Sequence, residues 1–359
     1  MATIRDVAKR AGVSVSTASL ALNGRPLVSE ETQRKVLRAA RELDYHPNEV
    51  ARSLADGRTR TLALFIPVTL EHLFSSAGFF GGLLKGMHRA ALQQEYHLSL
   101  HVVESEEETA ERVRAIVHSK RSDGLIITNP TVHPPYLNDL RKAAIPVVFV
   151  GRPQESDFAF VDNDNIEVGR LGVRQLAANG HRRIALLNGP RRFTFSQDRL
   201  EGYRKEILEI GLDLDDDLIW SSDLSEENAY STVSAAFRSG KTFSAIFCAS
   251  DIQAVGALRA LRDLSLKVPD DIAILAVNNT ALTRYYVPPI ATIDLHEEQL
   301  GYLSVKLLLR QIIGEQSARN ISDLQVKVPS SLVPRASCGC TPDSLTVDPE
   351  IGKGGGGSR

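Results

Sequence analysis

The sequence contains few cysteines and no long apolar segment. Its three cysteines, Cys248, Cys338 and Cys340, are an odd number without the spacing of metal ligands, so a disulfide-dense protein is excluded. No run approaches the ~18 consecutive apolar residues of a membrane-spanning helix. Residues 1–6 lack the charged-then-apolar order of a secretory signal. We therefore expect no membrane association and a location in the reducing cytoplasm.

Common catalytic motifs are also missing. The sequence contains no G-x-S-x-G elbow, no Walker A loop, no H-E-x-x-H and no G-x-G-x-x-G after its first predicted strand. The glycine-rich segment 78–82 has the wrong spacing to hold a phosphate. We expect neither an enzyme nor a bound metal or cofactor.

What the sequence does contain is an ordinary globular composition with an uneven charge distribution. Its 359 residues are 43% hydrophobic and 24% charged, which suits two or three domains. Residues 1–60 hold eleven basic and seven acidic residues, a net charge of +4, whereas the rest of the chain carries −6. A basic head on an acidic body is typical of a module that binds a polyanion.

Three short helices are predicted in the head. Gly12 ends the first, Ser14 caps the second, the segment 23–26 breaks it, and Ser29 caps the third. The apolar positions that share one face of each helix are Ile4, Val7, Ala8 and Ala11, then Val15, Ala18, Ala21 and Leu22, then Val36, Ala39, Ala40 and Leu43. This pattern fits a helix-turn-helix unit braced by a third helix, or a generic three-helix bundle.

A short helix is predicted over residues 47–57, which begin with Pro47 and end with Gly57. It has too few residues to be stable alone in water, so we expect it to order only on binding. The alternative is a flexible linker.

Beyond Arg60, short apolar runs alternate with amphipathic stretches. The runs predict strands buried on both faces, at 62–66, 124–127, 147–150, 184–187, 245–248 and 272–277. Helices are expected near 81–94, 107–119, 165–178, 199–210, 226–239 and 251–264. Such alternation predicts an α/β body with parallel, doubly wound sheets, and the number of strands favours two lobes with a ligand cleft between them.

The head and body together resemble the lac-repressor family of transcriptional regulators. In the head the resemblance is carried by residues 3–19 (TIRDVAKRAGVSVSTAS), 21–24 (ALNG), 28–32 (VSEET) and 43–48 (LDYHPN). In the body it is carried by residues 161–163 (VDN), 180–184 (GHRRI), 199–203 (RLEGY), 250–251 (SD), 268–272 (VPDDI), 288–293 (PPIATI) and 332–335 (LVPR).

The resemblance implies that the second helix lies in the major groove of double-stranded operator DNA. Thr3, Ser14, Thr17, Ser19 and Asn23 match positions that contact phosphates, and Ile4, Val15 and Ser16 match positions at the bases. Leu20 stands where many members have a guanine-reading arginine, so it would either meet a thymine methyl or pack inside.

For residues 47–60 the resemblance implies a hinge helix that pairs across a dimer and enters the minor groove. Asn48, Ala51 and Leu54 match its DNA-contacting positions. Leu54 matches the leucine that wedges between the central base pairs.

For the body the resemblance implies a two-lobed, periplasmic-binding-protein-like fold in which the chain crosses between lobes near 161, 291 and 325. The head would then be 1–46, the hinge and linker 47–60, and the effector-binding and dimerisation domain 61–340. Lobe one would comprise about 61–160 and 291–325, and lobe two about 161–290 and 326–340. The tail 341–359 is expected to be flexible and is left out of the functional argument.

The resemblance also implies an effector site in the cleft. Arg199, Ser250, Asp251 and Asn278 match its main positions, and Phe74, Thr128, Asn129 and Phe195 come from loops that line the same cleft in relatives. Asn278 replaces the usual aspartate, which removes a charge and favours a neutral ligand. The alternatives are an ion pair for Arg199, a helix cap for Asp251 and core contacts for Phe74 and Phe195.

These features predict a homodimeric repressor that binds a palindromic operator and is released by a small neutral effector, a mono- or oligosaccharide. The alternatives are a regulator activated by a corepressor, a solute-binding protein without a DNA role, and an enzyme on an α/β scaffold.

Overall fold

The computed structural model describes residues 2–22, 27–46, 57–68, 73, 77–143, 145–154, 157–314 and 321–339. The chain forms two compact units, residues 1–60 and residues 61–359. The predicted hinge helix, apart from Gly57, and the whole tail 341–359 lie outside the described residues. No helix in the described ranges is both long enough and apolar enough to cross a membrane.

The head contains three helices at the predicted places, namely α1 (Ile4–Ala11), α2 (Val15–Leu22) and α3 (Glu30–Glu42). Gly12 ends α1 in the left-handed conformation, with φ of 69°. The side-chain oxygen of Ser14 accepts a hydrogen bond from the Thr17 amide at 3.1 Å, and that of Ser29 accepts one from the Thr32 amide at 3.3 Å. The predicted caps of α2 and α3 are therefore confirmed.

The head core consists of small and β-branched side chains. Ala8 and Ala18 are almost fully buried, which allows α1 and α2 to approach closely. The other buried members of this core are Val7, Ala21, Val36, Ala39 and Ala40.

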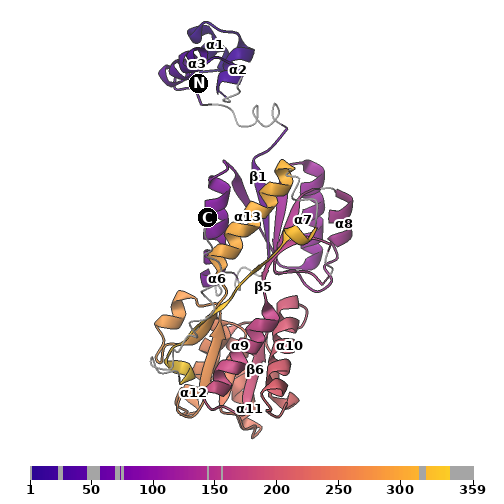
Figure 1. Ribbon diagram of the computed structural model, residues 1–359, viewed down its shortest axis with the longest axis vertical. Helices are drawn as coiled ribbons and strands as arrows, with labels where there is room; N and C mark the ends of the chain where they lie inside the picture. Colours follow the sequence, from indigo (N-terminus) through magenta and orange to yellow (C-terminus); the bar gives the residue numbers. More distant parts are fainter. Residues whose placement is uncertain are drawn as a thin grey trace, which may run out of the picture. The chain divides into compact units, whose positions relative to one another are not determined.

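The first lobe of the body is built on a fully parallel sheet (Figure 1). Its strand order is β11-β5-β4-β3-β1-β2. The strands are β1 (Thr61–Pro67), β2 (His97–Val103), β3 (Gly124–Thr128), β4 (Val147–Val150), β5 (Ala159–Asn163) and β11 (Gln325–Val328).

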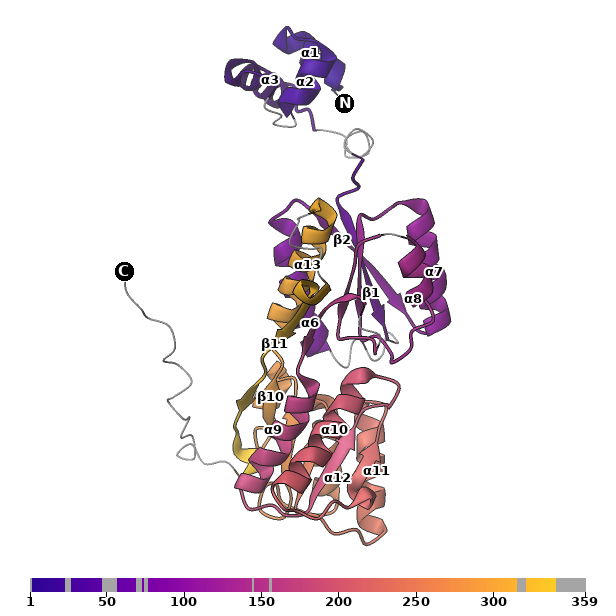
Figure 2. The same ribbon diagram turned by 45° about the vertical axis from the view of Figure 1, so that its right-hand side comes forward.

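Helices cover both faces of this sheet. α6 (Ala77–Leu92) and α13 (Glu297–Ile313) lie on one face, and α7 (Glu106–Ser119) and α8 (Leu137–Ala143) lie on the other (Figure 2). Successive side chains of β1 point to opposite faces of the sheet. Leu64 packs in the core beneath α6 and α13, whereas Phe65 packs in the core beneath α7 and α8.

The second lobe repeats this architecture, with strand order β12-β10-β9-β8-β6-β7 and only β12 antiparallel to its neighbour. Its strands are β6 (Ile184–Asn188), β7 (Ile219–Ser221), β8 (Ala245–Cys248), β9 (Ala273–Val277), β10 (Ala291–Asp294) and β12 (Ser331–Val333). Its helices are α9 (Asn165–Ala178), α10 (Thr194–Glu209), α11 (Glu226–Arg238) and α12 (Asp251–Asp263).

The chain crosses between the lobes three times, a few residues later than predicted at each crossing. β5 completes its pairing in lobe one before α9 begins lobe two, β10 pairs in lobe two before α13 returns, and β11 pairs in lobe one before β12. The predicted boundaries near 161, 291 and 325 were therefore placed too early, because each of these strands belongs wholly to the sheet before its crossing. All six predicted strands are present.

Two helices of lobe two touch through glycines. A Cβ built on Gly202 of α10 would lie 1.9 Å from the Ile166 carbonyl oxygen of α9, and one on Gly169 of α9 would lie 2.3 Å from the Arg199 carbonyl oxygen. Only glycine permits this separation, because the neighbouring atoms belong to the backbone. This contact fixes α10, which carries Arg199, against α9.

We expect Gly202→Ala to lower the free energy of unfolding of the body by about 3 kcal/mol, because two backbones must move apart. Gly81→Ala is the matched control, since a Cβ there meets nothing within 4 Å in a helix interior. That control should stabilise the protein by up to about 1 kcal/mol. Thermal unfolding checks both, and equal melting temperatures for the two variants would contradict the contact.

Candidate functional site

The start of α2 exposes a small polar surface on the head. Ser14, Val15 and Ser16 are exposed, and the apolar Val15 keeps 44% of its surface accessible. The Ser14 hydroxyl lies 2.8 Å from both the Ser16 and the Thr17 hydroxyl oxygens. A helix N-terminus that presents hydroxyls beside an apolar side chain can contact phosphates and base edges together.

The other predicted DNA-contacting residues take different positions. Thr3 is exposed and caps α1, since its amide and hydroxyl donate to Asp6 Oδ2 at 2.8 Å and 2.7 Å. These bonds lower the pKa of Asp6. Ile4 is half-buried against the head core, and Ser19 and Leu20 are half-buried on α2. The remaining predicted residues, Asn23, Asn48, Ala51 and Leu54, lie outside the described residues.

A pocket that is partly open to solvent lies between the lobes of the body. It gathers residues that follow the carboxyl ends of strands in both sheets, as ligand sites in open α/β folds do. Lobe one contributes Phe79, Phe80, Asn129, Val150, Gly151, Asp162 and Asn163. Lobe two and the crossing segments contribute Asn165, Phe195, Arg199, Leu224, Ala249, Ser250, Asn278 and Leu295, and α13 of lobe one contributes Leu300.

Arg199 is the buried cation of this pocket. Its Nε donates to Asn165 Oδ1 at 3.0 Å, and its Nη1 donates to the Ala249 carbonyl oxygen at 2.7 Å. Its guanidinium carbon lies 5.1 Å from the centre of the Phe195 ring. Burial lowers the pKa of Arg199 to about 10, so the side chain remains protonated at neutral pH. Three of its five N–H groups stay outside these two bonds.

Asp162 is the buried carboxylate of the same pocket. Its Oδ1 accepts hydrogen bonds from the Asn163 amide at 2.8 Å and from Asn165 Nδ2 at 3.0 Å. Burial raises the pKa of Asp162 to about 7. Asn165 thus connects Asp162 to Arg199.

The structure brings five of the predicted effector residues to the pocket: Asn129, Phe195, Arg199, Ser250 and Asn278. Asn129 and Asn278 both adopt positive φ, of 46° and 118°, which asparagine tolerates better than most residues. Phe195 stacks on Phe193, with ring centres 5.3 Å apart, and keeps contact with the pocket.

Two predicted effector residues do not line the pocket. Thr128 is fully buried, and its hydroxyl donates to the Phe65 carbonyl oxygen at 3.2 Å. Asp251 is buried at the start of α12, where it accepts from the Thr280 amide at 2.7 Å and the Thr292 hydroxyl at 2.8 Å. Internal hydrogen bonds hold both side chains inside the fold, and neither lines the pocket. Phe74 lies outside the described residues.

Sequence reasoning missed several pocket residues. Asp162 and Asn163 stand in a motif that was recognised but given no role, although they follow a strand that ends at the cleft. Phe79 and Phe80 come from the first turn of α6, and their ring centres are 5.3 Å apart. The glycine-rich segment 78–82 was considered only as a phosphate site, so the contribution of these two rings to an apolar wall was not predicted.

A second buried acidic group lies at the start of α13. Glu297 Oε1 is buried without a hydrogen-bond partner among the described residues. Burial, followed by repulsion from Asp294 and Asp251, raises the pKa of Glu297 to about 8. Burial also raises the pKa of Asp251 to about 6.

We expect the body to lose stability as pH rises from about 4 to about 8. A carboxyl whose pKa is higher in the folded state than in the unfolded state stabilises the fold only while protonated, so ionisation of Asp162, Asp251 and Glu297 costs free energy. Glu297→Gln should reduce the fall in melting temperature between about pH 6 and about pH 9. If the melting temperatures of the wild type and the variant fall equally with rising pH, Glu297 contributes nothing to the pH dependence of stability.

Two segments of the chain match known families. Residues 3–48 match the family described as bacterial regulatory proteins, lacI family. Residues 68–331 match the family described as periplasmic binding proteins and sugar binding domain of LacI family.

Whole-chain comparisons agree with these matches. The chain is 32% identical over 316 residues to the HTH-type transcriptional regulator CelR of Thermobifida fusca, covering 87% of this chain and 92% of that protein. It is 31% identical over 314 residues to the ribose operon repressor of Escherichia coli (strain K12), covering 87% and 93%.

Solved structures of similar proteins share the arrangement. The transcriptional regulator CelR–cellobiose complex superposes with a TM-score of 0.73 at 30% identity, covering 94% of this chain and 100% of the other. The lac repressor dimer bound to operator and the anti-inducer ONPF gives 0.80 at 27% identity, covering 94% and 99%. The chain therefore belongs to the lacI family of bacterial regulatory proteins, with a helix-turn-helix head and a body of the family's sugar-binding fold.

Proposed function

We propose that this chain is a saccharide-responsive transcriptional repressor. Two copies bind a palindromic operator through their heads, and a neutral mono- or oligosaccharide in the body lowers operator affinity. The names of similar proteins support this choice, since CelR was solved with cellobiose and another relative is the ribose operon repressor. We assign it to the cytoplasm and give it no catalytic role.

The observation that carries the proposal is the placement of Arg199. A buried, protonated guanidinium with spare N–H donors faces amide and hydroxyl groups and an aromatic ring in one pocket. Sugars offer both of the partners that such a pocket requires, because their hydroxyls accept and donate hydrogen bonds and their C–H faces pack on aromatic rings. Asn278 stands where relatives carry an aspartate, and the absence of that charge favours a ligand without net charge.

In this proposal α2 reads the major groove. Val15 and Ser16 contact base edges, and the hydroxyls of Ser14, Thr17 and Ser19 orient the helix on phosphates. Leu20 replaces a guanine-reading arginine, so we expect a different base preference at that position. For the hinge we retain the hypothesis that Leu54 wedges between base pairs and that Asn48 and Ala51 accompany it into the minor groove.

We place the dimer contact of the body on lobe two, where apolar side chains are exposed together. Tyr285 and Val287 are 79% and 90% exposed, and they border a groove formed with Val255 and Leu258 of α12. A second copy of the chain is the occupant we propose for this groove, because a palindromic operator requires two heads related by a two-fold axis.

We expect Val287→Asp to shift the chain from dimer to monomer at micromolar concentration and to weaken operator binding. A charge at the centre of an apolar contact must be desolvated without a partner. Sedimentation analysis measures the first effect and anisotropy of labelled DNA the second. If the variant remains dimeric, the dimer interface does not include Val287 and the proposed assignment is wrong.

Ligand and operator are coupled through the arrangement of the lobes. A saccharide that contacts both lobes binds one arrangement better than another, and that difference in affinity is the free energy available to displace the heads from DNA.

A thermal-shift screen tests the proposal. Cellobiose, ribose, glucose and longer saccharides are added to the full chain, with charged sugar phosphates as the matched comparison. A neutral saccharide that raises the melting temperature supports the assignment, because a ligand of the folded state stabilises it. Stabilisation by the charged compounds alone would overturn it, and retention of ligand binding without DNA binding would instead indicate a solute-binding protein.

A further inference from the structure

One partly buried ion pair joins the two lobes at the edge of the pocket. Arg152 lies in the loop after β4 in lobe one, and Asp198 lies on α10 in lobe two. Arg152 Nη2 donates to Asp198 Oδ2 at 2.6 Å. Their side chains are only 28% and 12% exposed.

The pair is adjacent to pocket residues on both sides. Gly151 and Arg199, the sequence neighbours of Arg152 and Asp198, line the pocket. Arg152 Nε also lies 3.9 Å from Oδ2 of Asp162, the buried pocket carboxylate. The Arg152 guanidinium therefore faces one carboxylate from each lobe.

A backbone contact supports the same junction. The Val132 amide of lobe one donates to the Arg192 carbonyl oxygen of lobe two at 2.8 Å, beside a bridge between Thr131 and Phe193. The backbone bond forms only while the loop after β3 lies close to the start of α10, and the ion pair only while the loop after β4 does so. Separation of the lobes breaks both.

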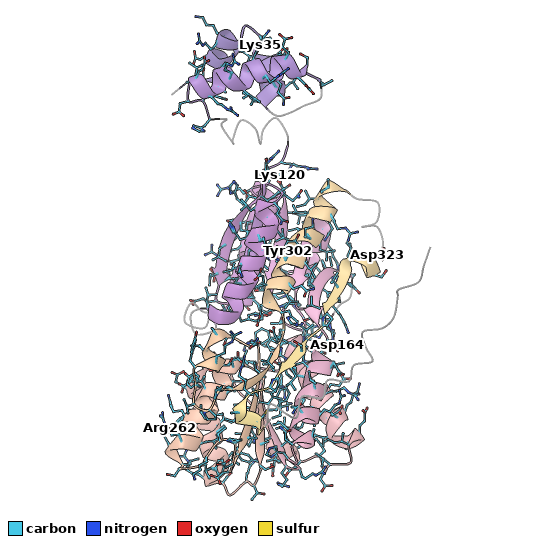
Figure 3. The ribbon with its side chains drawn as sticks, turned by 60° about the vertical axis from the view of Figure 1, so that its left-hand side comes forward. Lys35, Lys120, Asp164, Arg262, Tyr302 and Asp323 are labelled. Atoms are coloured by element: carbon cyan, nitrogen blue, oxygen red, sulfur yellow. The ribbon has the colours of Figure 1, made fainter. Side chains whose placement is uncertain are left out.

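A second ion pair between the lobes provides a contrast. Lys327 of β11 contacts Asp164, the cap of α9, at 2.7 Å, and the two side chains are 56% and 46% exposed. Asp164 lies where the chain crosses between the lobes (Figure 3). Exposed pairs contribute little because water screens them, whereas breaking a buried pair leaves a charge without a partner.

We propose that Arg152 and Asp198 form a latch that holds the lobes together around the ligand, with Arg152 as the positioning residue. The role of this latch in regulation rests on the proposed function, in which a saccharide binds between the lobes. The pair exists in one arrangement of the lobes, so it adds free energy to that arrangement alone and raises the affinity of any ligand that requires it. Loss of the latch frees the lobes to separate without removing any residue that lines the pocket.

Hydrogen exchange at the Val132 amide tests the latch in the full chain without ligand. Arg152→Met and Asp198→Asn should each speed exchange there by roughly tenfold or more, because each variant removes the ion pair between the lobes; Arg152→Met leaves the Asp198 carboxylate without this partner, and Asp198→Asn leaves Arg152 only Asp162 of its own lobe. The double variant should exchange no faster than either single variant, as expected for partners of one interaction. Arg152→Lys should retain part of the protection, and Lys327→Ala should leave it unchanged.

The ligand arm uses cellobiose as the probe. In Arg152→Met and Asp198→Asn, the affinity for cellobiose should fall by roughly the same factor by which the exchange rate of the Val132 amide rises. Lys327→Ala should bind cellobiose as the wild type does. Additive effects of the two single variants, or unchanged exchange at Val132, would overturn the latch. Absence of saccharide binding by the wild type, with the exchange results as expected, would overturn the proposed ligand and leave the latch standing.

Discussion

Arg199→Ala is expected to abolish the response to saccharide while operator binding stays within a few-fold of the wild type. The substitution removes two hydrogen bonds from a charged donor, to Asn165 and to Ala249, together with the stack on Phe195. It also removes the three N–H groups that these bonds leave for the ligand. Each charge-assisted hydrogen bond from them to the saccharide would contribute about 1.5–3 kcal/mol, so the loss of one or two should lower ligand affinity by roughly two orders of magnitude or more. Removing the cation also takes away one of the two arginines, with Arg152, that lower the pKa of Asp162, so this pKa should rise further.

The matched control is Arg191→Ala, because Arg191 is an exposed arginine in the loop before α10 that does not line the pocket. Titration calorimetry with the saccharide that stabilises the wild type measures the first effect, and anisotropy of operator DNA measures the second. Retained release of the operator by Arg199→Ala would remove Arg199 from the effector site.

Ala18→Leu is expected to abolish operator binding and to leave saccharide binding in the body unchanged. Ala18 is fully buried where α1, α2 and α3 meet, with Val7 and Val36 equally buried in the same core. Inserting a larger side chain into a packed core costs about 1–3 kcal/mol. A domain of this size has little stability in reserve, so that cost is enough to unfold it.

Leu37→Ala is the control for the head, because Leu37 is 37% exposed on α3 and lies outside the buried head core. Anisotropy with operator DNA and calorimetry with the saccharide separate the two units of the chain. Operator binding that survives in Ala18→Leu would mean that α2 is not positioned by this core.

The head was predictable because its structure is set by local signals. Ser14, Gly12 and Ser29 stand where caps and helix ends are required, and the small residues Ala8 and Ala18 fall on the buried faces. In the body, six strands were predictable because each is a continuous apolar run buried on both faces, as Leu62 to Ile66 of β1 show.

The edge strands were not predictable from the same signal. β2, β7, β11 and β12 are the four outer strands of the two sheets, and each is short or partly exposed, so its residues form no continuous apolar run. Their place depends on pairing with strands far away in the sequence, as β11 with β5. The three crossings between the lobes lie later than predicted for the same reason, because the ends of β5, β10 and β11 are set by pairing with strands far away in the sequence.

Within the effector site, residue type alone did not separate ligand contacts from structural ones. Asp251 and Asp162 are both buried aspartates at the ends of secondary structure elements, yet Asp251 bonds to Thr280 and Thr292 whereas Asp162 faces the pocket. The difference depends on which loops the two lobes bring together. Only the three-dimensional arrangement supplies that information.

The central claim is that a saccharide bound in the body controls the affinity of the head for operator DNA. The most direct measurement is the affinity of the full chain for a labelled duplex, selected from a random library, with and without the saccharide that raises the melting temperature. We expect affinity to fall linearly with salt on logarithmic axes and to fall further when the saccharide is added. Unchanged or tighter DNA binding with the saccharide bound would contradict the account.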